Sequence, residues 1–67
     1  MNESELWIKA YRKAEEVCDG KCDADKIADR IVRAYHNAFI DYIEMGVETL
    51  QAIWKAKEYA NILIAEI

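Results

Sequence analysis

Apolar side chains recur every three or four residues along most of this chain, the spacing that places them on one side of an α-helix. The strict alternation of apolar and polar residues that is typical of a half-buried strand is absent. Short stretches around Gly20 and Gly46 interrupt the helical pattern. The pattern predicts an all-α fold of one domain, with helices at about 4–18, 24–44 and 49–66.

The first predicted helix has one broad apolar face. Ser4 can cap its beginning, because a serine side chain accepts a hydrogen bond from a free backbone N–H. Its end is predicted at the turn Asp19-Gly20-Lys21, where Gly20 can adopt the left-handed conformation that closes a helix. Asp23 is then the expected N-cap of the second helix. The apolar face consists of Leu6, Trp7, Ala10, Tyr11, Ala14, Val17 and Cys18.

The second predicted helix carries two adjacent apolar lines, which together make a wide face suited to burial. One apolar residue, Ile40, lies among polar neighbours instead, and we expect it to contact another chain. The first line is Ile27, Ile31, Tyr35, Ala38 and Tyr42, and the second is Ala28, Val32, Phe39 and Ile43.

Gly46 allows two interpretations. The second helix can end there, with Val47 making the apolar contact that follows such a glycine and Thr49 capping a third helix. Alternatively, one helix continues through the glycine and forms the long arm of a helical hairpin. We favour the break, because the order Gly-Val-x-Thr supplies both a stop and a start. The residues of the third helix predicted to face the core are Leu50, Ile53, Trp54, Ala56, Ala60, Leu63 and Ile67.

The last six residues, 62–67, would place apolar side chains in nearly every direction around a helix. A surface helix has one apolar side, so we expect a single chain to leave part of this segment uncovered. A second copy of the chain is the simplest cover, which predicts a homodimer or a higher oligomer. The predicted interface residues are Ile40, Tyr59, Ile62, Leu63, Ile64 and Ile67.

The length of 67 residues favours the same conclusion, because a chain this short builds only a modest core and often relies on oligomerisation. The formal net charge of −4 argues against nucleic acid and anionic membranes as partners. No apolar run approaches the roughly 18 residues of a membrane span. The polar amino terminus does not resemble a signal peptide, so we expect a cytoplasmic protein with reduced cysteines.

Cys18 and Cys22 are spaced as Cys-x3-Cys, which is compatible with unlinked thiols, a disulfide or a metal site. A structural zinc site needs four ligands, and His36 is the only histidine that could join the pair. We therefore expect unlinked thiols and no metal or other cofactor. His36 also has no nucleophile or orienting carboxylate on its own helical face, so we do not expect an enzyme.

Basic residues suggest one further possibility, a small anionic ligand such as a nucleotide bound where two subunits meet. An aromatic ring, for example that of Tyr11, could stack on the base. The basic groups are Lys26, Arg30 and Arg33 on the second helix, and Lys9, Arg12 and Lys13 on the first. This ligand is the alternative prediction. The first prediction is a small acidic helical interaction module that regulates or inhibits a protein partner, because no motif indicates chemistry.

Overall fold

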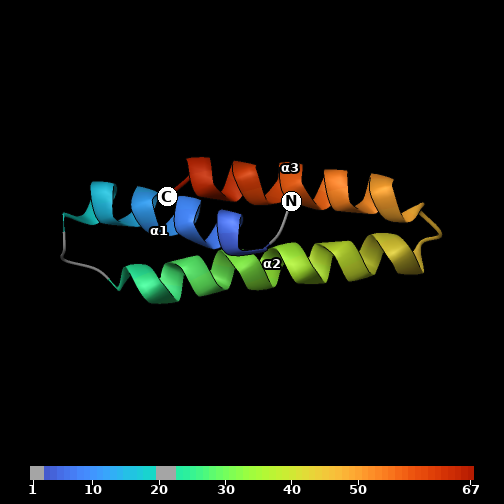
Figure 1. Ribbon diagram of the computed structural model, residues 1–67, viewed down its shortest axis with the longest axis horizontal. Helices are drawn as coiled ribbons and strands as arrows, with labels where there is room; N and C mark the ends of the chain where they lie inside the picture. Colours follow the sequence, from blue (N-terminus) through green and yellow to red (C-terminus); the bar gives the residue numbers. More distant parts are fainter. Residues whose placement is uncertain (1–2, 20–22) are drawn as a thin grey trace.

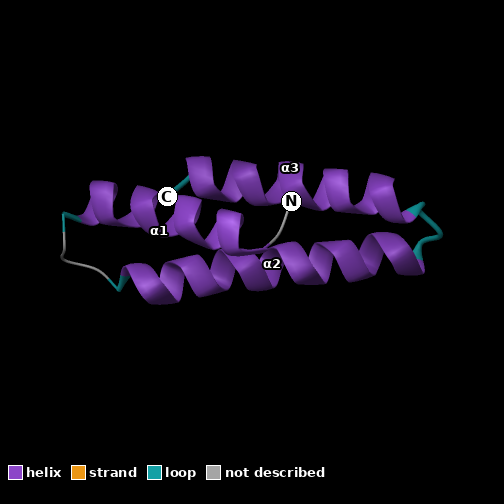
Figure 2. Ribbon diagram, in the orientation of Figure 1, coloured by secondary structure: helices purple, strands orange, loops and turns teal. Residues whose placement is uncertain are grey.

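The computed structural model describes residues 3–19 and 23–67. It contains three helices: α1 (Glu3–Cys18), α2 (Ala24–Glu44) and α3 (Thr49–Ala65). Figure 2 shows the described residues as helices and connecting segments, with no strand. The prediction of an all-α fold is confirmed, and three separate helices form rather than a hairpin with one long arm.

The helices form an elongated bundle whose Cα atoms extend over 41 × 18 × 15 Å. α2 runs antiparallel to α1 and α3 and makes most of the contacts with each of them (Figure 1). α1 has 16 residues and α2 has 21, so α1 is shorter by roughly 8 Å. The α2–α3 pair therefore continues beyond the beginning of α1, as Figure 1 shows.

The core is built largely from alanine, with few large side chains. Among the residues that the structure describes, only Leu6 is both large and completely buried. Small side chains at a helix contact allow the two backbones to approach closely, so α3 can lie tightly against α2. The buried cluster consists of Leu6, Ala10, Ala28, Ile31, Tyr35, Ala56, Ala60 and Ile64.

The connection between α2 and α3 is a Schellman turn, in which two backbone hydrogen bonds close the helix end. The N–H of Gly46 donates to the carbonyl of Ile43, and the N–H of Val47 donates to the carbonyl of Tyr42, each at 3.0 Å. Gly46 has a φ of +88°, the left-handed conformation that glycine adopts without a side-chain clash. The predicted break at Gly46 is thus confirmed.

The predicted caps differ in detail from the structure. Ser4 lies inside α1 and is not its cap. Glu48, not Thr49, is the N-cap of α3, and neither Glu48 nor Asp23, the N-cap of α2, makes a side-chain capping hydrogen bond. At the end of α1 the residue in the left-handed conformation is Asp19, with a φ of 50°. The prediction for Gly20 lies outside the described residues.

The buried side of α3 also differs from the prediction. Leu50 and Trp54 were expected in the core, but they are 73% and 60% exposed. The buried residues at this end of α3 are Ala52 and Ala56. The line of alanines is the buried side of α3, and the two larger side chains lie on other sides of the helix.

The carboxyl-terminal segment is covered largely by its own chain. Ile64 is only 4% exposed, and Leu63 and Ile67 pack against the buried cluster. The expectation that a single chain leaves these residues uncovered is therefore wrong for this part of the segment. The reason is that α1 and α2 pack on two different sides of the last turns of α3, as the grooves that contain Ile64 and Leu63 show. Of the other predicted interface residues, Ile40, Tyr59 and Ile62 are exposed.

Candidate interaction surface

Two side-chain contacts show which sides of α2 and α3 face α1. Near the beginning of α1, a carboxylate oxygen of Glu3 lies 2.6 Å from Nδ1 of His36 on α2. Further along, Nζ of Lys9 donates a hydrogen bond of 2.8 Å to Oδ1 of Asn61 on α3. His36 and Asn61 therefore mark the α1-facing sides of their helices.

The α1-facing sides of α2 and α3 continue toward the α2–α3 turn, where α1 no longer covers them. Seven residues make about two helical turns, so residues seven apart lie on one side of a helix. Ile43 is seven residues beyond His36, and Trp54 is seven residues before Asn61. Phe39 and Leu50 lie on the same sides, four residues before Ile43 and Trp54 respectively. We call the surface formed by Phe39, Ile43, Leu50 and Trp54 the open end.

The open end is apolar and largely exposed. Ile43 is 39% exposed, in addition to the high exposure of Leu50 and Trp54, while Phe39 packs partly against the core. Large apolar side chains that gather on one surface commonly mark a binding site. The helical spacing of Leu50 and Trp54 predicts a place in the core, and nothing in the sequence shows that α1 stops short of them.

Charged residues lie at both limits of the open end along its length. Glu44 ends α2, and Glu48 precedes α3 at the turn. Lys57 lies at the other limit, on α3 between Trp54 and Asn61, and is partly buried. The limit of the open end at the α2–α3 turn is thus acidic, because of Glu44 and Glu48. The limit on α3 that is nearer to α1 carries the positive charge of Lys57.

Tyr59 lies on the opposite side of the α2–α3 pair. It lines a shallow groove with Tyr42 and Met45, and Nζ of Lys55 lies 5.7 Å from the centre of the Tyr42 ring. Such a distance allows a cation–π attraction. Tyr59 therefore does not share a surface with Trp54, although both are exposed aromatic residues of α3.

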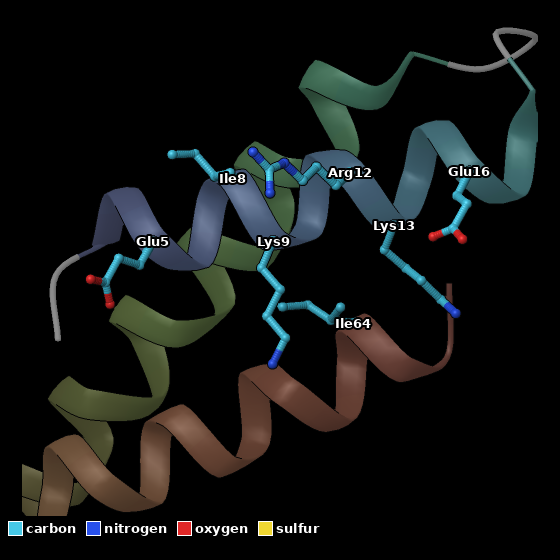
Figure 3. Close-up of a pocket in the computed structure, with 7 residues that line it drawn as sticks. All are labelled: Glu5, Ile8, Lys9, Arg12, Lys13, Glu16 and Ile64. Carbon is cyan, nitrogen blue, oxygen red and sulfur yellow. The ribbon is translucent and has the colours of Figure 1, made fainter.

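A basic groove lies between α1 and the end of α3. Figure 3 shows Lys9, Arg12 and Lys13 around it, with Ile8 and Ile64 among its apolar lining. Its volume is about 450 Å³, and Glu5 and Glu16 complete its lining. The spacing of the three cations on α1 indicates this group from the sequence, but Ile8 as part of the lining is visible only in the structure.

The other predicted ligand residues are spread over the surface of α2 and its neighbours. Lys26 pairs with Asp23 at 3.7 Å, and Arg33 is exposed. Arg30 lines a groove between α2 and α3 that includes Ile67. Tyr11 stacks on Trp7 with ring centres 5.0 Å apart. Within one chain these residues do not form a common site.

The tyrosines that the structure perturbs are less acidic than usual. Burial, and secondarily the negative charge of Glu3, raise the pKa of Tyr35. The charge of Glu15 is the main cause that raises the pKa of Tyr11, followed by burial. A raised pKa keeps both phenols neutral at physiological pH, so neither is prepared as a nucleophile or a base.

The prediction of unlinked thiols is wrong for Cys18, which is disulfide-bonded. That prediction came from the expected compartment, and the spacing of the cysteines had left a disulfide open. Cys22 lies outside the described residues.

Within residues 3–19 and 23–67, no three His, Cys, Asp or Glu side chains form a group that could hold a metal ion. His36, the candidate third ligand, is paired with Glu3 instead.

Comparison with known proteins gives no relative for this chain: no family model, curated protein or solved structure matches it. None of the described helices combines the length and the apolar character that are needed to cross a membrane. The features of the bundle that bear on function are therefore its surfaces, of which the open end and the basic groove are the two most distinctive.

Proposed function

We propose that the protein is a small, non-enzymatic interaction module that regulates or inhibits a protein partner by binding it at the open end. One observation carries this proposal. Ile43, Leu50 and Trp54 remain exposed on the sides of α2 and α3 that α1 covers elsewhere. Tryptophan in particular is enriched among the residues that dominate the energy of protein contacts.

The shape of the open end favours a helical partner. α1 already lies along the α2–α3 pair as a third helix, and the open end is the continuation of that position (Figure 1). A partner helix would pack on these side chains through its own apolar residues spaced three and four apart. Glu44 and Glu48 at the turn side favour a partner segment that carries a positive charge opposite them.

A photo-reactive amino acid in place of Leu50 tests this function. Irradiation of cells that produce the variant is expected to attach a defined protein to position 50, identified by mass spectrometry. The matched control carries the same amino acid in place of Ile62, which is exposed on α3 but lies outside the open end. The absence of a specific adduct at position 50, or the same adduct at both positions, would contradict the proposal.

A second candidate function is the binding of a small anionic ligand, and the basic groove favours it. Lys9, Arg12 and Lys13 bring three positive charges to one hollow, against two negative charges from Glu5 and Glu16, beside the apolar surface of Ile8 and Ile64. A site of this composition suits a molecule with both an anionic and an apolar part, such as a nucleotide. This groove belongs to a single chain, unlike the site at a subunit boundary that the sequence suggested.

Calorimetry with ATP separates the two locations of an anion site. For the basic groove, Arg12→Gln is expected to weaken binding by about tenfold, because a charge-assisted hydrogen bond contributes roughly 1.5–3 kcal/mol. Arg33→Gln, a change of the same kind on α2, should leave the affinity unchanged. If Arg33→Gln weakens ATP binding and Arg12→Gln does not, the result favours the site predicted from the sequence. If the unaltered chain gives no heat of binding, the proposal of an anionic ligand is wrong.

The disulfide at Cys18 argues against the cytoplasmic location that the sequence predicts, because disulfides persist in oxidising compartments and are rare in cytosolic proteins.

A further inference from the structure

We propose that the partner at the open end is a second copy of this chain, packed antiparallel about a two-fold axis. This inference rests on the proposed function of the open end and names its occupant. In such a dimer, α2 of one copy lies on α2 of the other, and α3 lies on α3. The middle of the assembly then contains four helices, and each outer part keeps the three helices of one chain.

The lengths of the elements suit this arrangement. The open end runs from the level of His36, where α1 begins, to Glu44 at the end of α2. These eight residues span about 12 Å of helix. A second copy presents an open end of the same length, so the beginning of each α1 meets the α2–α3 turn of the other copy. Each chain thereby fills the space that the other leaves beside its α1.

The position of α1 selects the antiparallel orientation. In a parallel arrangement, the body of the second copy would lie where α1 already packs on α2 and α3. In the antiparallel arrangement, the two α1 helices lie at opposite ends of the assembly. Only this orientation lets both open ends come together without displacing a helix.

One pair of opposite charges on α3 is complementary under the same symmetry. A two-fold axis brings the turn side of one open end to the α1 side of the other. Glu48 of one copy therefore approaches Lys57 of the second copy, and the reverse contact forms as well. Trp54 and Leu50, which lie between these charges on α3, meet their counterparts near the axis. A parallel arrangement would instead place like charges at the same level.

These features favour a second copy over an unrelated helix. An unrelated helix accounts for the apolar exposure, but it has no reason to match the length of the uncovered segment or the opposite charges of Glu48 and Lys57 on either side of Leu50 and Trp54. The contact is also short, since the open end spans only about 12 Å of helix. We therefore expect a reversible dimer.

Sedimentation equilibrium of the full, oxidised chain from 1 µM to 1 mM tests the inference. A monomer–dimer equilibrium is expected. Trp54→Ala should raise the dimer dissociation constant by about thirtyfold or more, the effect of a central tryptophan anchor. Ile62→Ala, which removes an exposed apolar side chain elsewhere on α3, should change it less than about threefold. Circular dichroism would verify that each variant is folded.

A charge exchange makes the test specific for the proposed orientation. Lys57→Glu and Glu48→Lys should each weaken the dimer, because each places like charges opposite one another. The double variant should recover most of the lost affinity. Lys55→Glu, on the opposite side of the α2–α3 pair, is the matched control for Lys57→Glu and should not weaken the dimer.

The outcomes separate this inference from the proposed function. A chain that stays monomeric at 1 mM overturns the self-pairing, and so does a dimer that withstands Trp54→Ala. Failure of the double variant to recover affinity overturns the antiparallel orientation. If the chain is monomeric but position 50 still cross-links to another protein, the open end remains an interaction surface and its occupant is that protein.

Discussion

At the scale of single residues, alanine determines how the helices of this protein meet. Ala52, Ala56 and Ala60 are completely buried on α3, whereas Leu50 and Trp54 on the same helix are exposed. Short side chains let two backbones approach, and dispersion attraction is strongest when many atoms are in contact. The close contact therefore forms along the alanines, and the larger residues lie on other sides of the helix.

Tyr35 shows how a single buried residue links stability to pH. Burial in the core raises its pKa, so the folded chain retains the phenolic proton after the unfolded chain has lost it. Its contribution to stability is complete below the unfolded value of about 10 and is lost as the pH rises through the folded pKa. Between pH 9 and pH 11, we predict that the free energy of unfolding of the unaltered chain falls more than that of the Tyr35→Phe variant.

Urea unfolding at both pH values measures this difference. Tyr59→Phe removes an exposed phenol and serves as the control, which should keep the pH dependence of the unaltered chain. Equal losses in the unaltered chain and in Tyr35→Phe would show that other groups cause the alkaline sensitivity.

At the scale of the elements, the end of α2 is determined by the backbone of Gly46. Its φ of +88° costs an ordinary L-residue energy, and no atom lies within 4 Å of the position that a Cβ would occupy. Any penalty for substitution must therefore come from the backbone conformation and not from a clash. This local origin explains why the break could be predicted without knowledge of the packing.

Gly46→Ala is expected to lower the free energy of unfolding by about 1 kcal/mol, the lower part of the range for a left-handed residue with a side chain. Gly46→Asn should cost less, because asparagine tolerates this conformation better than alanine. Chemical denaturation of the three chains measures both values. Equal stability of all three would show that the turn does not depend on a left-handed residue.

The difference in helix lengths is the other decisive property at this scale. α1 begins beside His36, so the α2–α3 pair continues for about two turns without a third helix. Ile43 and Trp54 are exposed because of this difference, since the same faces are covered by α1 further along. The open end is therefore a consequence of element length, and not of an unusual apolar pattern in α2 or α3.

At the scale of the whole molecule, the bundle is complete at one end and lacks a third helix at the other. A small domain gains little stability from its own core, so association at the open end would add burial where the chain has most to gain. Dimerisation stabilises the folded state by mass action. Two predictions belong to this scale. The chain forms a dimer whose population depends on concentration, and the double variant with Glu48→Lys and Lys57→Glu recovers the affinity that each single variant loses.

The sequence by itself determined the three helices, their limits and the break at Gly46. These features depend on helical spacing, on the scarcity of glycine and proline, and on one residue that adopts the left-handed conformation. Each acts over a few neighbouring residues, so it can be read from the order of residues alone. Lys9, Arg12 and Lys13 could also be recognised as a group, because they share one side of one helix.

Only the tertiary structure decided which sides of the helices are buried. It placed Ile64 in the core and left Leu50 and Trp54 exposed, although all three fit a helical apolar pattern. An apolar side chain is buried only where another element covers it. That coverage depends on how far α1 reaches along α2 and α3, which no local pattern contains.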